Sequence, residues 1–136
     1  MIVSLCYEVV FACFLRADTP EEALDALRWH LGLLGSRPAS LDDEAHSDRL
    51  LCPDPASSLP GRDVASLQPQ PITVADTGEA PEWGLYSRKL WSEDSMEQMA
   101  TIMELLAPHI AAGGYGGYFR EEHASEATAF TFAVDS

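Results

Sequence analysis

The pattern of apolar positions is densest near the start of the chain, between Cys6 and Arg16. Read as a strand, this stretch places Tyr7, Val9, Phe11, Cys13 and Leu15 on one face and Val10, Ala12 and Phe14 on the other. A strand with one face in water alternates apolar and polar residues, whereas this one is apolar on both faces. It predicts a central strand whose first face is covered by helices and whose second face is covered by the middle of the chain or by a partner subunit.

Two helices are predicted. The first begins after Asp18, with Thr19 as the capping residue, Pro20 at the first helical position and Glu22 closing a capping box. Its apolar stripe consists of Leu24, Leu27, Leu31 and Leu34. The second helix begins at Asp94 and buries a stripe that runs from Met96 to Ile110, with a kink or restart at Pro108.

Three further strands are expected at Glu82 to Trp91, Tyr118 to Glu122 and Ala127 to Val134, the last two as a C-terminal hairpin. The element order becomes strand, helix, variable segment, strand, helix, strand, strand. This order predicts an α+β fold, a mainly antiparallel sheet with two helices packed on one face, and a ferredoxin-like arrangement is one candidate.

The segment 36–81 is rich in Pro, Ser and Asp and is predicted to be variable, with short strands at Val64 to Leu67 and Ile72 to Val74. Residues 1–136 are expected to form one domain around it. A long irregular connection in a compact domain usually covers a surface or carries function. We expect cover for the far face of the sheet from Leu50, Leu51, Val64, Leu67 and Ile72.

Charge and cysteine content narrow the function classes. The formal net charge of -14 argues against nucleic acid and anionic membranes as partners, because both are bound by basic patches. Its simplest consequence is solubility, and the more specific alternative is a surface that meets a basic protein. Three cysteines without a C-x-x-C pair, and no signal-peptide pattern or membrane span, predict free thiols and a cytoplasmic location. Cys52, beside Pro53, is the best candidate for a reactive thiol.

No motif predicts catalysis, a cofactor or a metal. The glycines from Gly113 to Gly117 follow a helix and precede a strand, so they cannot present a helix N-terminus to a phosphate. We expect them to let backbone and aromatic rings pack closely. The four histidines lie in four different elements without zinc-site spacing, and no nucleophile elbow is present.

Mixed charge gathers on two predicted strands, at Tyr86, Arg88 and Lys89 on one and at Arg120, Glu121 and Glu122 on the other. If the two strands are neighbours, opposite charges pair across them. The functional alternative is a small polar pocket or an interaction patch. The candidate residues for such a site are Tyr7, Tyr86, Arg88, His109, Tyr115 and Arg120.

Three classes of function follow. The first is a non-catalytic protein-interaction module whose partner is a basic protein or a second copy of the chain, similar in surface character to small acidic inhibitors and immunity proteins. The second is a small-molecule binder or cofactorless enzyme in a ferredoxin-like dimer. The third is an accessory subunit of a larger complex. The absence of a catalytic constellation in the sequence favours the interaction module.

Overall fold

The computed structural model of the chain describes residues 5–41, 44, 46, 49–57, 59–69, 82–111 and 114–132. Its elements are β1 (Cys6–Leu15), α1 (Glu21–His30), β2 (Val64–Pro69), β3 (Trp83–Ser92), the 3-10 helix η1 (Glu93–Gln98), α2 (Met99–Leu106), the 3-10 turn η2 (Ala107–His109), β4 (Gly114–Glu121) and β5 (Thr128–Phe132). The predicted α+β fold class is confirmed. Within these residues, no helix is long and apolar enough to span a membrane.

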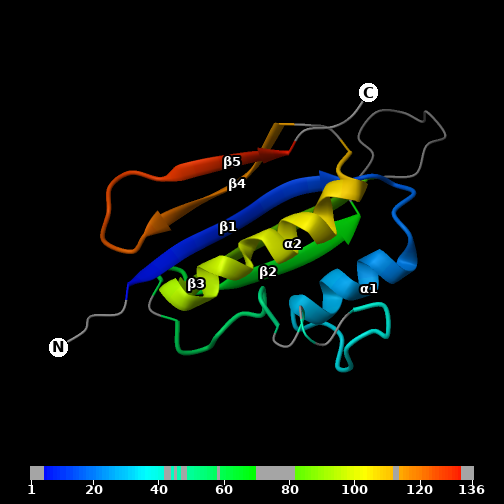
Figure 1. The fold of residues 1–136 in the computed structure, drawn as a ribbon, viewed down its shortest axis with the longest axis horizontal. Coiled ribbons are helices and arrows are strands. Elements are labelled where there is room, and N and C mark those ends of the chain that lie inside the picture. The colour runs from blue at the N-terminus through cyan, green and yellow to red at the C-terminus, as the bar shows by residue number, and fades with distance from the viewer. Residues whose placement is uncertain are drawn as a thin grey trace.

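The five strands form one sheet in the order β2-β3-β1-β4-β5, and every neighbouring pair is antiparallel. β1 is therefore central, as its doubly apolar pattern predicts (Figure 1). Along the chain, α1 follows β1 and precedes β2, and β3 lies between these two strands. In the same way α2 connects β3 to β4, and β1 lies between them. The two β-α-β units thus interlock.

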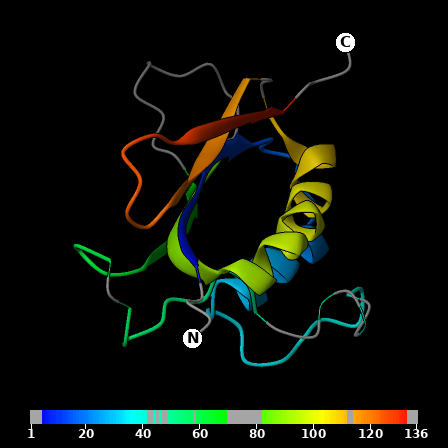
Figure 2. The same cartoon turned by 60° about the vertical axis from the view of Figure 1, so that its left-hand side comes forward.

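Both helices lie on the same side of the sheet (Figure 2). The core there joins Val9, Phe11, Cys13 and Leu15 of β1 to Leu24 and Leu27 of α1 and to Ile102 and Leu106 of α2. These helical residues recur at the spacing of a single helical face, and burying them explains why the stretches fold as helices. We call the opposite side of the sheet the open face.

The open face is covered only at one end by the described residues. Val10 is 3% exposed there, whereas Phe14, which follows it on the same face toward the end of β1, is 52% exposed. The predicted cover by Leu50, Leu51 and Leu67 is wrong, because these residues pack into the core beneath the helices instead. Val64 lies on the open face but is exposed, and Ile72 lies outside the described residues.

The predicted capping of both helices is wrong. Pro20 occupies the N-cap of α1, and the Thr19 hydroxyl donates to the Arg16 carbonyl oxygen at 2.6 Å. Asp94 lies in η1, and α2 begins only at Met99, without a side-chain cap. The helix begins one residue later than predicted, so Thr19 lies before the N-cap, and its hydroxyl instead closes the turn after β1.

The glycines of β4 allow the C-terminal hairpin to pack against β1 and onto the core. A Cβ at Gly117, where φ is +145°, would overlap the carbonyl oxygen of Val10. A Cβ at Gly116 would lie 2.5 Å from the Phe132 ring. The expectation that these glycines permit close packing of backbone and rings is confirmed, and so is the hairpin itself.

Replacing Gly117 with alanine is expected to lower the free energy of unfolding by about 3 kcal/mol or more, because the new Cβ meets backbone in a strained conformation. Chemical denaturation measures the loss. Gly35→Ala is the matched control, since a Cβ at Gly35 meets nothing within 4 Å. Equal stability of the two variants would contradict the close packing of β4 on β1.

Candidate functional site

A buried carboxylate, Glu8 of β1, stands at the centre of a polar cluster on the open face. The residue is 4% exposed and lies opposite Leu90 on β3 and Arg120 on β4. Its neighbours on the same strand face are apolar, so no other residue of β1 can neutralise it. A charge taken out of water in this way needs partners from adjacent strands.

Three side chains bind the two oxygens of Glu8. Oε2 accepts hydrogen bonds from Arg88 Nε at 2.6 Å and from the Tyr118 hydroxyl at 3.2 Å. Oε1 accepts from Arg120 Nε at 3.1 Å and from a terminal nitrogen of the same guanidinium at 2.8 Å. Glu8, Arg88, Arg120 and Tyr118 form what we call the Glu8 cluster, with a formal charge of one positive unit.

The two arginines are also held from outside the sheet. Arg88 Nη1 donates to the carbonyl oxygens of Pro60 at 2.7 Å and Arg62 at 3.1 Å. Arg120 Nη1 donates to the carbonyl oxygen of Ala124 at 2.7 Å. Each guanidinium is thus fixed between the carboxylate and a loop at the edge of the sheet, which leaves little freedom to be lost on binding a partner.

The pKa values of Glu8 and Tyr118 are both shifted away from neutral pH. Burial alone would raise the pKa of Glu8, but hydrogen bonds and charges from Arg120 and Arg88 outweigh it and lower that pKa below its ordinary value. Burial and the charge of Glu8 raise the pKa of Tyr118. At neutral pH the carboxylate is charged and the phenol protonated, so neither group is poised to exchange a proton. The cluster suits binding better than acid-base catalysis.

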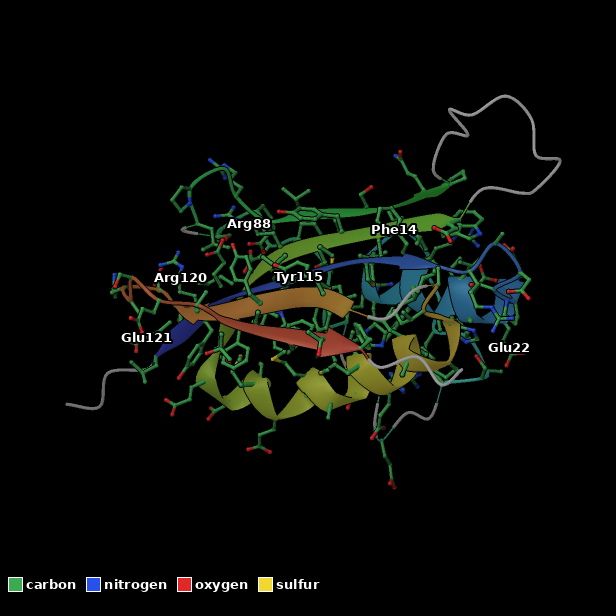
Figure 3. All side chains as sticks on the ribbon, turned by 90° about the horizontal axis from the view of Figure 1, so that it is seen from above. Phe14, Glu22, Arg88, Tyr115, Arg120 and Glu121 are labelled. Carbon is green, nitrogen blue, oxygen red and sulfur yellow. The ribbon has the colours of Figure 1, made fainter. Side chains whose placement is uncertain are left out.

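Exposed apolar side chains lie on the open face next to this cluster and beyond it, toward the end of β1. The large apolar residues exposed among those described are Phe14, Leu33, Val64, Tyr86 and Tyr115. All except Leu33 lie on the open face, as the strand register places them (Figure 3). The face therefore combines exposed aromatic rings with two fixed arginines.

The candidate residues from the sequence are divided by the fold. Tyr86, Arg88, Tyr115 and Arg120 share the open face. His109 lies at the end of η2, in a cavity of about 310 Å³ on the helix side. Tyr7 packs partly buried against the helix-side core.

The prediction that charges on β3 and β4 pair directly with each other is wrong. β3 and β4 are separated by β1, so Arg88 and Arg120 meet across Glu8. Sequence reasoning missed Glu8 as a site residue. Its signal was a single acid among apolar residues at the start of a strand apolar on both faces.

A second buried polar pair connects α1 to the loop before β2. His30 is fully buried; its Nδ1 accepts from the Leu50 backbone N–H at 3.1 Å, and its Nε2 lies 2.9 Å from His46 Nδ1. Because Nδ1 accepts, Nε2 carries the proton and donates to His46. Burial, followed by the nearby His46 and Arg49, lowers the pKa of His30 to about 4.

The fold also places the three cysteines. Cys6, Cys13 and Cys52 are free, and burial raises the pKa of the Cys13 thiol to about 12. Cys52 is half-buried, with its Sγ 3.8 Å from the Pro53 carbonyl oxygen. In the described parts of the chain, no three His, Cys, Asp or Glu side chains lie together in a way that could hold a metal ion.

No protein-family model matches the chain, and no curated protein or solved structure is significantly similar to it. Function is therefore inferred from the residues and their geometry.

Glu8→Gln is expected to lower the free energy of unfolding at neutral pH by about 3 kcal/mol, because two half-buried arginines lose their shared counter-charge. Glu22→Gln, at an exposed carboxylate of α1, is the control and should change little. The folded pKa of Glu8 is lowered, so its contribution is present above its ordinary pKa of 4.5 and is lost as pH falls through the folded pKa. The difference between Glu8→Gln and the native protein should therefore shrink in acid, and a constant difference would contradict an ionic role.

His30 makes stability depend on pH in a different window. Its folded pKa lies below the ordinary 6.5, so the unfolded chain takes up a proton first, and stability falls as pH drops from 6.5 to about 4. The loss should reach about 3 kcal/mol at its full extent. His30→Gln should flatten this part of the profile, whereas His123→Gln, at an exposed ring, should not. Denaturant midpoints across this pH range measure the effect, and an unchanged slope in His30→Gln would contradict it.

Proposed function

We propose that this protein is a non-catalytic protein-interaction module that binds its partner through the open face of the sheet. The observation that carries the proposal is the gathering of exposed apolar side chains on that face, at Phe14, Val64, Tyr86 and Tyr115. Contiguous exposed apolar surface marks interaction sites, and aromatic residues and arginine are enriched in their centres. The Glu8 cluster supplies two arginines of this kind.

The charges around the molecule favour a second copy of the chain as the partner. On the open face the strands carry Glu8, Arg88 and Arg120, with no excess of negative charge. The acids of α1, η1 and α2 are Glu21, Glu22, Asp25, Glu93, Asp94, Glu97 and Glu104. Two copies that met through their helices would bring these acids together and repel each other. Two open faces avoid that repulsion, whereas a basic protein would be drawn to the helix side.

The proposal includes a ferredoxin-like arrangement in which β5 extends the sheet beyond β4. Its support is the pair of interlocked β-α-β units and the order of β1 to β4. It also places the protein in the cytoplasm, since Cys6, Cys13 and Cys52 are free thiols.

A small-molecule site is the second candidate function. A cavity of about 310 Å³ opens between α1, the end of α2 and the turn at Leu41. It is lined by Pro20, Glu22, Ala23, Ala26, Ser40, Leu41, Leu105 and His109. Its volume is at the lower end of the range for ligand pockets, and a mostly apolar lining with a few polar groups is typical of them. A small apolar molecule with one cationic or hydroxyl group would match Glu22 and His109.

Solution mass by light scattering tests the proposed interaction. We expect a dimer that persists at high salt, because the contact is mainly apolar. Phe14→Glu should convert it to a monomer of unchanged fold. Leu33→Glu is the matched control, because Leu33 is 58% exposed, close to the 52% of Phe14, but lies off the sheet. A dimer that survives Phe14→Glu, or one that Leu33→Glu disrupts equally, would reject the open face as its contact.

A further inference from the structure

We propose that a small pocket beside the end of β3 binds a phosphate-like oxyanion. The pocket has a volume of about 120 Å³. It is lined by Arg49, Leu50, Lys89, Leu90, Trp91, Ser92, Ser95 and Gln98. None of these residues belongs to the Glu8 cluster, so the proposal does not depend on the function of the open face.

The charge of the lining is opposite to that of the chain. The sequence has 22 acidic and 8 basic side chains, yet two of the bases and no acid line this pocket. The remaining polar side chains, two serines, a glutamine and a tryptophan, can all donate hydrogen bonds. A lining of donors that includes no carboxylate of its own is the complement of an oxyanion.

Lys89 is held in place by one carboxylate and keeps N–H donors that a ligand could use. Its Nζ lies 3.5 Å from Asp63 Oδ2, which is long for a charge-assisted hydrogen bond. The Asp63 carboxylate, whose side chain is 1% exposed, also accepts from the backbone N–H groups of Leu90 at 3.2 Å and Asp54 at 2.9 Å. Asp63 therefore anchors the lysine without saturating its three donors.

Arg49 is fixed from the opposite side. One terminal nitrogen donates to the carbonyl oxygens of Leu34 and Gly35, each at 3.0 Å, and the guanidinium lies 5.4 Å from the centre of the Trp29 ring. A guanidinium has five N–H donors, so this anchoring leaves others to a ligand. With Asp63 counted, the region carries one excess positive charge.

Two hydroxyls of the lining leave one donor for a ligand. The hydroxyls of Ser92 and Ser95 are 3.0 Å apart, so one of them donates to the other and the second is left to donate elsewhere. An oxyanion in the pocket gives that hydroxyl an acceptor. Trp91 also lines the pocket, but its side chain is 3% exposed and its Nε1–H is closed off from solvent, so the indole signal reports on the pocket and does not bind the ligand.

The ligand class follows from size and donor geometry. A volume of about 120 Å³ holds one tetrahedral oxyanion and little more. Cationic donors from Arg49 and Lys89, together with a serine hydroxyl, suit the several oxygens of a phosphate group. The group can arrive as free inorganic phosphate or at the end of a phosphate monoester.

Titration with inorganic phosphate, followed in ¹H–¹⁵N spectra, tests the site. The chain has three tryptophans, so Trp91→Phe identifies the Trp91 indole signal. We expect phosphate to move that signal in a saturable way, and chloride at equal ionic strength to leave it in place. Lys89→Gln should weaken binding by about tenfold through loss of a charged donor. Arg16→Gln is the matched control, because it removes the same charge from an exposed pair with Asp18.

The outcomes are distinct. Equal effects of chloride and phosphate, no saturable change, or equal weakening by Arg16→Gln and Lys89→Gln would overturn the site. Should Lys89→Gln fail to fold, Ser95→Ala gives the same reading through a smaller loss of affinity. Tighter binding of O-phosphoserine than of inorganic phosphate would support a monoester ligand, and equal or weaker binding would support the free anion. The dimer measurement is unaffected by either result.

Discussion

The carboxylate of Glu8, buried between Arg88 and Arg120, sets the register of the centre of the sheet. Removing charges from water costs several kcal/mol per ion, and the four hydrogen bonds to Glu8 offset this cost only in one alignment of β3, β1 and β4. A slip of one residue would carry Glu8 to the helix side, among Val9 and Phe11. The cluster therefore contributes less to net stability than to the choice of one strand pairing.

The two faces of the sheet differ in packing and in charge. The helix side holds the close-packed core and the acidic surface of α1, η1 and α2. The open face holds exposed rings and fixed arginines, with Val10 buried beneath them. An interaction through the open face makes use of surface that the domain does not need for its own core, and it keeps the negative charge of two copies apart.

The few basic side chains are nearly all used to hold the fold. Arg16 and Arg28 bind acids near α1, Arg88 and Arg120 bind Glu8, and Lys89 contacts Asp63. Arg37 and Arg49 lie over the Trp29 ring. Most of the acids in the described parts of the chain are exposed, and a pocket lined by two bases and no acid stands out against them. Arg49 also lies close to His30, so α1, the loop before β2 and the pocket share one polar region.

Local patterns in the sequence were sufficient for the elements of this protein. The run from Val9 to Leu15 identified a central strand, the leucine stripe identified α1, and the alternation after Thr128 identified the hairpin. Such patterns work because burial of one face imposes a period on a single element. Four of the six candidate residues for the site also share the open face.

The tertiary structure decided what those residues contact. The period of apolar residues in a strand does not reveal that β1 lies between β3 and β4. Without that strand order, Arg88 and Arg120 cannot be assigned as partners of Glu8. The start of α1 was predicted one residue too early for a similar reason, since the turn after β1 holds Thr19 against the Arg16 carbonyl oxygen. Leu50 and Leu51 were assigned to the wrong face because a leucine in an irregular segment has no period that indicates its side. Strand order and loop paths depend on contacts between residues distant in the chain, which only the packed domain supplies.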